Sequence, residues 1–543
     1  MLTPWLLVLL LLRNRRLYMT KAGARVCCVI DCGTVQVRAY IVEIDGQSDL
    51  IAGGKSQVSP SYHILENLER DVDCSDALRG GTLNRLTMDH IEHAIQDIVH
   101  CARAYGVADN DIKAVGTSAM RECINADAVV EWVLQRTGVE IQVIDSAEEA
   151  RLYFAALRRL WWEESRSIDD APLLMLDIGS GATVTSLIDG GKLVHSVDEH
   201  FGTIRVFEQF QGLTDSSDFV ATVDRFTHGA VRMILRRLPQ RKLTELVVTG
   251  GEVRDLAHIL DRTQDRLHRI ELRQLEEWLE PLRNISRPAQ ARLLRVDSQH
   301  ADRILLAASV LTNLMRETDM PSVTVPEMRL RDGLVADQLP GSLGERHLDR
   351  EQVLGMAQML SQRFGMEAAY AQNTAELATQ IFDQTADLHR LSDRDRTLLE
   401  FAALVHDIGA YINVRNRHKH SMYLLHSVDL PGLDGVEVEI VSHVVRYHRR
   451  AVPQLNHHEF QALGRSVRIR IMILAAILRL AYGLDVERTQ RIRNVRCEVS
   501  QGRLLMHVDR RQIALERWSI ASKSQMFMEV FGLQVVLLPR GGD

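Results

Sequence analysis

The sequence predicts an α/β protein with two related lobes, followed by an all-α domain and a small α+β segment. At 543 residues the chain exceeds what one hydrophobic core usually serves, so several domains are expected. A strand, an aspartate and a glycine turn occur together twice, and residues 350–484 show helical periodicity. The predicted parts are a tail (1–24), a first lobe (25–150), a second lobe (151–340), a helical domain (345–490) and a C-terminal α+β segment (491–543).

The composition is that of an ordinary folded protein, with 46% apolar and 25% charged residues. The formal net charge of −7 gives no general attraction to nucleic acid, so we expect no nucleic-acid partner. Three of the seven cysteines, Cys27, Cys28 and Cys32, crowd a predicted buried strand without metal-ligand spacing. Free cysteine packs as a small hydrophobic residue, so this usage predicts a reducing, cytoplasmic location.

The first residues contain an apolar run, Trp5–Leu12, that is too short to span a membrane. No basic residue precedes it, although Arg13, Arg15 and Arg16 follow it. We expect no stable membrane insertion. A poor signal peptide, a short anchor and a true start at Met19 stay open as interpretations.

The first lobe opens with a predicted β-hairpin whose tip holds Asp31. An apolar run, Val26–Ile30, leads into a turn at Gly33, and the β-branched pattern resumes at Val37–Ile44. Helices and strands then alternate, which predicts ligand-handling turns at the carboxyl ends of strands. The expected elements are helices at 88–105 and 126–135 and strands ending near 117 and 144.

The second lobe repeats this opening. Leu173–Leu176 leads into Asp177 and a glycine turn, and Val184–Ile188 follows as the returning strand. Two related lobes of this kind resemble the actin, sugar kinase and acetate kinase superfamily. The later expected elements are a strand at 245–248 with the turn Thr249–Gly251, a helix at 301–316 and the linker Pro340–Gly344.

Glycine turns that follow strands can bind phosphate, because their backbone N–H groups converge on an anion. One such turn alone is more often an ordinary tight turn, but several in this order favour phosphate handling. The candidate phosphate-binding residues are Gly33, Thr34, Thr117, Gly179, Ser180, Gly181, Thr183, Gly250 and Gly251.

Five motifs give the sequence a specific resemblance. In chain order they are Val29–Thr34, Val115–Arg121, Val143–Leu152, Leu176–Thr183 and Leu330–Leu334. Their order resembles the exopolyphosphatase and guanosine pentaphosphate phosphatase family, written Ppx/GppA. The resemblance covers residues 25–510 and includes Ala403–Gly409, Arg417–Ser421, Ser427–Gly432 and Arg446–Arg450.

The resemblance implies a homodimeric phosphohydrolase that uses Mg²⁺ and water attacking in line. It would release the terminal phosphate of inorganic polyphosphate, or the 5′-γ-phosphate of guanosine pentaphosphate. Glu149 matches the family glutamate that orients or deprotonates the water, and Arg121 matches an arginine that meets a phosphate. Asp177 and Asp31 would hold the Mg²⁺. From the residues alone, Glu149 also fits an exposed acid in a capping box with Ser146, and Arg121 fits a surface salt bridge.

The second glycine turn departs from the family pattern. The family has serine, threonine and glutamate where this chain has Ala182, Thr183 and Val184, and Val35 replaces the usual asparagine of the first turn. A positioned acid or base contributes on the order of 10²- to 10⁴-fold in rate, so Val184 predicts slow hydrolysis. Glu252, next to the third turn, is a candidate replacement.

These departures keep two further hypotheses open. The second is a regulatory protein that binds polyphosphate or guanosine polyphosphate without efficient turnover. The third is an actin-like ATPase or sugar kinase, which the C-terminal resemblance disfavours.

The helical domain resembles an HD phosphohydrolase domain that has lost metal ligands. His406 and Asp407 match the HD doublet, but Asn373 stands where the first helix has histidine and Tyr482 where the last helix has aspartate. Too few ligands remain for a two-metal cluster, so we expect a structural role for the doublet.

Basic residues gather in the same domain, and two interpretations stay open. A run of charges is usually a solvated face, whereas the family resemblance favours a channel in which several charges bind a long polyanion. The candidate channel residues are His418, His420, Arg446, His448 and Arg449.

Overall fold

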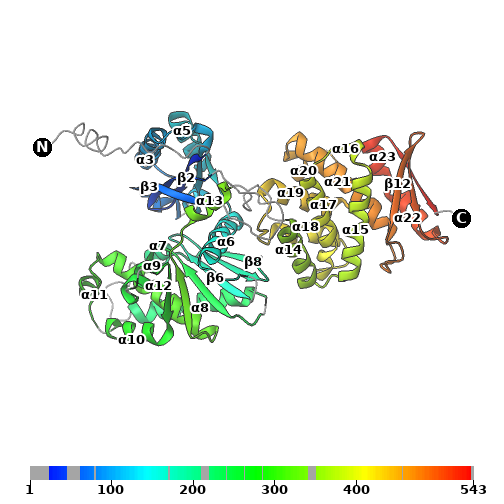
Figure 1. Cartoon of the computed structure of the whole chain (residues 1–543). Helices are drawn as coiled ribbons and strands as arrows, with labels where there is room; N and C mark the ends of the chain where they lie inside the picture. Colours follow the sequence, from blue (N-terminus) through cyan, green and yellow to red (C-terminus); the bar gives the residue numbers. More distant parts are fainter. Residues whose placement is uncertain are drawn as a thin grey trace. The chain divides into compact units, whose positions relative to one another are not determined.

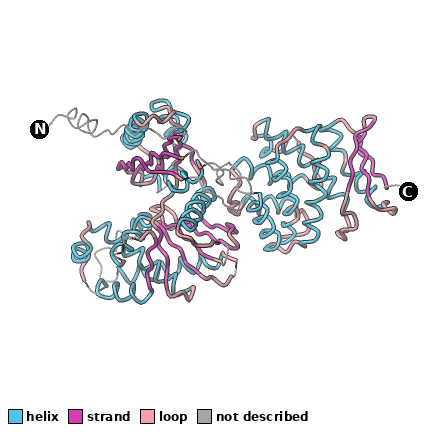
Figure 2. Tube along the Cα trace, viewed as in Figure 1, coloured by secondary structure: helices cyan, strands magenta, loops and turns pink. Residues whose placement is uncertain are grey.

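The computed structural model describes residues 24–45, 61–78, 81–168, 172–209, 219–239, 241–261, 263, 265–283, 285–339, 350–454 and 456–539. The tail before residue 24 and the predicted Pro340–Gly344 linker lie outside these residues. The chain forms two compact units, one of residues 1–145 with 329–345 and the other of 146–328 with 346–543. Figure 1 labels the helices and strands, and Figure 2 separates them by colour.

The first unit is built on a five-stranded sheet with the strand order β3-β2-β1-β4-β5. Its strands are β1 (Arg25–Cys32), β2 (Gln36–Ile44), β3 (Tyr62–Asp71), β4 (Ile112–Gly116) and β5 (Ile141–Val143). β1 and β2 are antiparallel with Asp31 opposite Arg38, and β4 runs parallel to β1. The predicted hairpin is confirmed, and its three cysteines are buried in β1.

Helices alternate with these strands, as the sequence predicts. They are α2 (Ser75–Leu78), α3 (Arg85–Ala104), α4 (Ser118–Glu122) and α5 (Ala126–Thr137). α3 begins after Asn84, whose side chain accepts a hydrogen bond from the amide of Thr87. One face of α3 then buries Ile91, Ile95 and Ile98, which is the spacing of an amphipathic helix.

A late segment of the chain also belongs to the first unit. α13 (Leu330–Gln338) packs against β1 and β2, and Arg331 near its start is fully buried. The Arg331 guanidinium donates to the carbonyl oxygen of Ala39 at 3.1 Å and to Oδ1 of Asn67 at 2.8 Å. The sequence predicted this segment at the end of the second lobe, but these buried hydrogen bonds hold it on the first sheet.

The second unit begins with a six-stranded sheet that repeats the first one. Its strands are β6 (Leu173–Ile178), β7 (Thr183–Asp189), β8 (Lys192–Glu199), β9 (Glu245–Thr249), β10 (Leu267–Glu271) and β11 (Ser322–Pro326). The sheet order is β10-β11-β9-β6-β7-β8, so β8-β7-β6-β9-β11 matches β3-β2-β1-β4-β5. The strand directions match as well, and the predicted duplication is therefore confirmed.

The helices of this lobe cover both faces of its sheet. They are α6 (Ser146–Glu163), α7 (Thr203–Gln209), α8 (Phe219–Arg237), α9 (Gly251–Leu260), α10 (Leu272–Arg283), α11 (Arg287–Leu294) and α12 (Ser298–Glu317). One hydrophobic core joins α8, α9, α10 and α12 to Leu174, Leu176 and Ile178 of β6. The described part of that core contains no residue of α6, although α6 packs on β7 and β8. We infer that α6 covers the opposite face.

The rest of the second unit is mainly helical. Its elements are α14 (Arg350–Arg363), α15 (Ala368–Gln384), α16 (Ala386–His389), α17 (Asp393–Val405), α18 (Arg417–His426), α19 (Gly435–Tyr447), α20 (His458–Ala462), α21 (Arg465–Leu484), β12 (Val495–Ser500), β13 (Arg503–Val508), α22 (Ala514–Lys523), α23 (Gln525–Phe531) and β14 (Gln534–Pro539). The predicted C-terminal α+β segment is confirmed as a three-stranded sheet with two helices. Among the described helices, none combines the length and apolar character needed to cross a bilayer.

Candidate functional site

The first glycine turn holds Asp31 in a buried, arginine-rich setting. The amide of Gly33 donates to the carbonyl of Gln36 at 3.0 Å, and the amide of Cys74 donates to the carbonyl of Thr34 at 2.8 Å. Burial raises the pKa of Asp31, while the charges of Arg38 and Arg331 oppose this rise. The positive charges near Asp31 are thus arginine side chains of the same chain. The expected role of Asp31 in holding Mg²⁺ stays a prediction.

The second glycine turn directs its carbonyl groups toward the start of α7. The amides of Thr203 and Ile204 donate to the carbonyls of Gly179 and Ser180, each at 3.0 Å, and Nε of Arg205 donates to the carbonyl of Gly181 at 2.8 Å. Within the described residues, the amides of Ser180 and Gly181 donate to no acceptor. This turn therefore has backbone N–H groups that can meet an anion.

The third glycine turn lies beside the second. β9 runs parallel to β6 with Thr249 level with Asp177, so the two turns leave the sheet at the same edge. Gly250 has φ of 141°, and a Cβ atom there would lie 2.4 Å from the carbonyl oxygen of Ile178. Only glycine permits both this backbone conformation and this close approach. The fold thus brings the predicted turns at Gly179–Gly181 and Thr249–Gly251 together.

Val184 occupies a central place next to Asp177. It lies directly opposite Asp177 on β7, and its other neighbour across the sheet is Asp198 on β8. Side chains of directly opposed residues share one face and stand about 5 Å apart at Cβ. The sheet therefore places two carboxylates on either side of the valine that departs from the family pattern.

Glu149 lies in the first turn of α6 and is buried, with 8% of its surface exposed. The alternative of an exposed helix-start acid is therefore wrong. Leu174, Leu176 and Ile178 point into the core of α8, α9 and α12, so Asp177 points to the opposite face, the one that α6 covers. Glu149 and Asp177 thus belong to the same side of the second sheet.

Arg121 lies at the end of α4 and is anchored inside the first unit. Its Nη1 donates to the carbonyl oxygen of Ile144 at 2.9 Å, immediately before α6 begins. Thr117, just before α4, is buried at the end of β4. The expected phosphate contacts of these two residues stay predictions.

Glu252 has a structural contact of its own. Its Oε1 accepts from Nε of Arg303 at 3.0 Å, which ties the start of α9 to α12. An acid held in this ion pair is a poor substitute for the missing glutamate. Asp198 is the carboxylate that the strand register places next to Val184, and the sequence analysis missed it.

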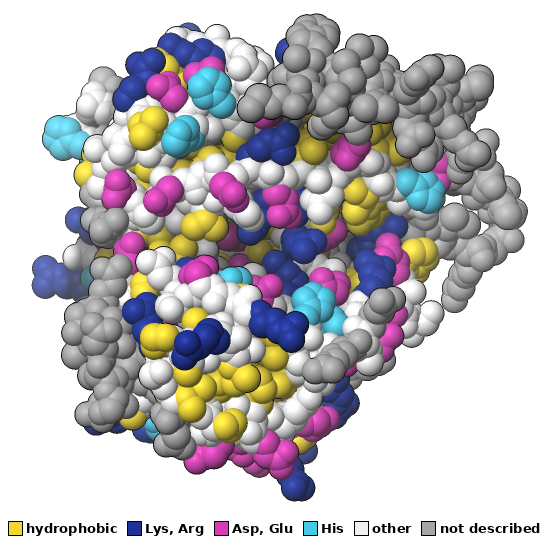
Figure 3. Space-filling model, turned by 90° about the vertical axis from the view of Figure 1, so that its left-hand side faces the viewer, with side chains coloured by type: hydrophobic (Ala, Val, Ile, Leu, Met, Phe, Trp, Pro, Cys, Tyr) yellow, Lys and Arg dark blue, Asp and Glu magenta, His cyan; other side chains and the backbone are white. Residues whose placement is uncertain are grey.

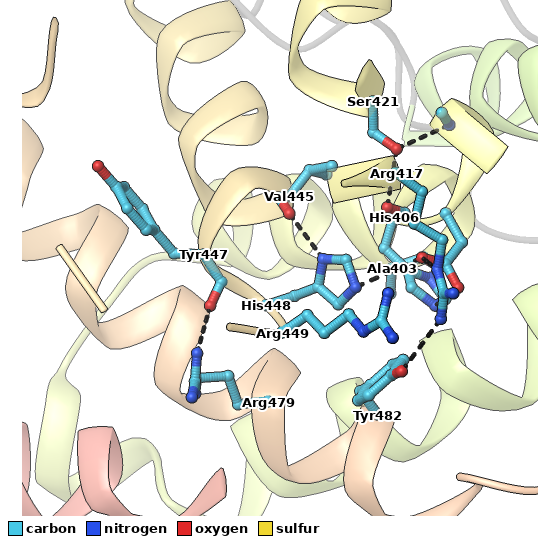
Figure 4. Close-up of polar contacts among 12 residues, drawn as sticks. Ala403, His406, Arg417, Ser421, Val445, Tyr447, His448, Arg449, Arg479 and Tyr482 are labelled. Atoms are coloured by element: carbon cyan, nitrogen blue, oxygen red, sulfur yellow. Dashed lines mark hydrogen bonds and ion pairs between the residues drawn. The ribbon is translucent and has the colours of Figure 1, made fainter. Parts of the chain in front are cut away.

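In the helical region, Asp407 has two arginines against its carboxylate. Nε of Arg417 lies 2.5 Å from Oδ1 of Asp407, and Arg488 pairs with Oδ2. Nε2 of His448 lies 3.5 Å from Oδ1. Nη2 of Arg417 also donates to the hydroxyl of Tyr482 at 3.2 Å (Figure 4). The expected structural role of the doublet fits this arrangement, since guanidinium groups neutralise the carboxylate.

Burial and charge set the protonation of this cluster. Burial acts to raise the pKa of Asp407, but the contact with His448 and the charge of Arg417 outweigh it, so the pKa lies well below its ordinary value. Burial lowers the pKa of His406 to about 4, and its Nε2 contacts the hydroxyl of Tyr370 at 3.0 Å. His406 is therefore neutral at neutral pH beside an ionised Asp407.

The candidate channel residues do not share one environment. His418 and His448 are buried, with 2% and 0% of their surfaces exposed, and burial lowers the pKa of His418 to about 3. His420, Arg446 and Arg449 are partly exposed. Figure 3 draws the side of the two sheet-bearing lobes, where basic and acidic side chains are interspersed, and it does not show the candidate channel residues. A polyanion channel lined by the partly exposed residues stays a prediction.

Comparison with known proteins connects these features to one group. A sequence model of the Ppx/GppA phosphatase family matches residues 55–342, and a model of Ppx/GppA phosphatase domain III matches residues 355–523. A guanosine-5′-triphosphate,3′-diphosphate pyrophosphatase of Photobacterium profundum is 23% identical over 434 residues, which cover 78% of this chain and 83% of that protein.

Two solved structures also resemble part of the chain. A Ppx/GppA family member of Aquifex aeolicus has a TM-score of 0.48 and 18% identity, covering 57% of this chain and 96% of its own. An exopolyphosphatase of Cytophaga hutchinsonii ATCC 33406 has a TM-score of 0.48 and 18% identity, covering 59% of this chain and 99% of its own.

Proposed function

The chain belongs to the Ppx/GppA phosphatase family, and from this premise we propose that it hydrolyses the terminal phosphoanhydride bond of a phosphate chain. The substrate is inorganic polyphosphate or guanosine pentaphosphate. Water attacks the terminal phosphorus in line, the bond to the bridging oxygen breaks, and orthophosphate leaves. The proposal includes a cytoplasmic homodimer, as the family resemblance and the cysteine usage predict.

The observation that carries this proposal is the pair of adjacent turns at Gly179–Gly181 and Thr249–Gly251. Gly250 permits the close approach of these two turns. The amides of Ser180 and Gly181, in the second glycine turn, are available to an anion. Backbone amides that converge from two turns suit the negative charge of a terminal phosphate, and they can stabilise its oxygens in the transition state.

Glu149 is the residue we assign to the attacking water. It is buried at the start of α6 on the side of the sheet to which Asp177 points. Its neighbour Glu148 is engaged elsewhere, because Nε and Nη2 of Arg151 each donate to its carboxylate at 2.7 Å. Arg121 is the proposed phosphate-binding arginine, since a guanidinium fork matches phosphate oxygens.

The residues at this edge fit the expected Mg²⁺. Carboxylate oxygens are the ligands that Mg²⁺ prefers, and Asp177 and Asp198 share one sheet face. Asp177 would hold the ion, with Asp198 as a second acid close by. A bound Mg²⁺ would supply positive charge to the phosphate oxygens. The chain contributes the position of the carboxylates and, at Val184, an apolar contact where relatives have an acid.

The helical region is proposed to be an HD-like domain without a metal. Arg417 and Arg488 stand against the carboxylate of Asp407 and supply the positive charge there. His406 remains beside it as a neutral side chain, and His448 is packed against it with none of its surface exposed.

A second candidate function is binding of the same polyanions without turnover. Val184 favours it, because a buried valine between Asp177 and Asp198 can neither move a proton nor bind a metal. Both functions use the same turns and differ in whether orthophosphate appears.

Release of orthophosphate from long-chain polyphosphate and from guanosine pentaphosphate, with Mg²⁺ present, tests the proposal. We expect release by the native protein and a loss of about 10²- to 10⁴-fold in Glu149→Gln. Glu148→Gln is the matched control, one residue away and bound to Arg151, and should keep most of the rate. Tight polyphosphate binding with no release by the native protein would establish the second candidate instead.

A further inference from the structure

A second group of histidine and carboxylate side chains lies at the C-terminal end of α9, away from the glycine turns. His258 comes from α9, His268 from β10, and Glu327 directly follows β11. One ligand atom from each lies within 4.8 Å of the other two. Three separate elements of one lobe therefore converge on a single point.

The separations in this group match those between ligand atoms around a metal ion. Nε2 of His258 lies 3.1 Å from Oε1 of Glu327, and Nε2 of His268 lies 3.3 Å from the same oxygen. Among the described residues, neither Nε2 of His268 nor Oε1 of Glu327 has a hydrogen-bond partner, although both atoms are buried. Tetrahedral zinc with bonds of 2.0–2.1 Å places its ligand atoms about 3.3 Å apart.

A further carboxylate orients His268 for this role. Nδ1 of His268 lies 3.2 Å from Oδ2 of Asp261, so the proton belongs on Nδ1 and the lone pair of Nε2 faces Glu327. A carboxylate behind a metal-binding histidine is the usual way in which proteins fix its tautomer.

We propose that His258, His268 and Glu327 bind a divalent transition-metal ion, with Zn²⁺ as the metal that two imidazoles and one carboxylate favour. His258 has 55% of its side chain exposed, which gives the ion a route from solvent. A water molecule completes the tetrahedron. Glu327 and Asp261 supply two negative charges against the two positive charges of the ion.

This site is built differently from the Asp407 cluster. There the histidines and the carboxylate also lie within ligand distance, but Arg417 and Arg488 already neutralise the acid. At Glu327 the recorded partners are the two histidines. The group around Glu327 thus has lone pairs that can bind a cation. In the group around Asp407, the arginines of the chain supply the positive charge.

A bound ion would join the end of α9 to β10 and to the exit of β11. α9 begins at Gly251, in the third glycine turn. The ion would therefore fix the opposite end of the helix that follows this turn. The proposed role is structural, and it does not depend on whether the protein hydrolyses polyphosphate.

Metal binding by the full chain, stripped with a chelator and dialysed against Zn²⁺, tests the site directly. We expect one Zn²⁺ per chain by elemental analysis, and at least tenfold weaker binding in His258→Gln and in Glu327→Gln. His258 is exposed and Glu327 lies in a loop, so both variants should fold. The matched control is His300→Gln, which should bind as the native protein does. His300 lies on α12, and its Nε2 contacts Oδ2 of Asp255 on α9 at 2.8 Å.

Two further variants make the result specific. Asp261→Asn leaves the three ligands in place and should weaken Zn²⁺ binding by about 10- to 100-fold through the orientation of His268. His448→Gln should leave binding unchanged, because its cluster holds arginines. The visible absorption of bound Co²⁺ should show tetrahedral coordination in the native protein and change in His258→Gln. Equal Zn²⁺ binding in the native protein and in His258→Gln with Glu327→Gln would overturn the proposal.

Discussion

Asp177 at the edge of the second sheet and Asp407 in the helical region are both buried aspartates, with 5% and 2% of their surfaces exposed. Their surroundings differ in charge. Asp407 lies between Arg417 and Arg488, whereas Asp177 shares a sheet face with Val184 and a second acid, Asp198. The comparison shows two ways of keeping a carboxylate inside a protein. Asp407 is neutralised by arginines of the chain, and Asp177 lies on the sheet face where we propose that a cation binds.

We expect the largest effect, on the free energy of unfolding, from a substitution that removes the charge of Asp407. Asp407→Ala leaves the Arg417 and Arg488 side chains without their acid and should lower the free energy of unfolding by about 3–5 kcal/mol. Urea unfolding of the variant measures this change. Asp383→Ala is the control, since its ion pair with Arg396 is exposed and should contribute less than about 1 kcal/mol. Equal stability of both variants would contradict the role assigned to Asp407.

The second largest effect is expected at low pH, which should destabilise the helical region. Burial lowers the pKa of His406 from 6.5 to about 4 and that of His443 to about 4, so the unfolded chain takes up protons before the folded one does. The free energy of unfolding should therefore fall between about pH 6.5 and pH 4, by a few kcal/mol at most. Unfolding curves across this range measure the slope, and His406→Gln should make it shallower. A flat profile would show that these histidines are not buried as neutral groups.

Restoring an acid at the sheet edge should raise activity. Val184→Glu returns a carboxylate to the position between Asp177 and Asp198, and phosphate release should increase by about 10²-fold, the lower end of what a positioned base contributes. Val184→Gln has a similar shape without the charge and serves as the control. The account of the departure fails if both variants release phosphate at the native rate.

The smallest predicted change concerns Asp198. Asp198→Asn removes the second acid on this face and should lower the rate of phosphate release by about tenfold, mainly through weaker use of Mg²⁺. The measurement is the rate as a function of Mg²⁺ concentration. Asp189→Asn, on the same sheet and paired with the exposed Arg241, should change neither quantity. An unchanged Mg²⁺ dependence in Asp198→Asn would remove it from the site.

The hairpins and the duplication of this molecule could be predicted from short sequence patterns. The hairpins with Asp31 and Asp177 follow from apolar runs that end in glycine turns, and the duplication follows from their repetition. Asp198 was not predicted, because its position beside Val184 depends on the pairing register of β8. Arg488 lies 81 residues from Asp407 in the chain, so no spacing rule connects them.

Burial separated alternatives that the sequence left open. Glu149 fitted both an exposed capping residue and a residue of the site, and its burial excludes the first. His418 and His448 looked like exposed basic residues because they stand among arginines, yet they pack inside the helical region. Assignment of α13 to the first unit also needed tertiary contacts, since the hydrogen bonds of Arg331 join residues far apart in the chain.

The Mg²⁺ dependence of phosphate release from polyphosphate, measured in the native protein, Asp177→Asn and Asp407→Asn, tests the central claim most directly. The account predicts that the native protein and Asp407→Asn reach half of their maximal rates at the same Mg²⁺ concentration, at a temperature where both are folded. Asp177→Asn should need at least tenfold more Mg²⁺ or lose activity. A normal Mg²⁺ requirement in Asp177→Asn, or a shift in Asp407→Asn instead, would contradict the account.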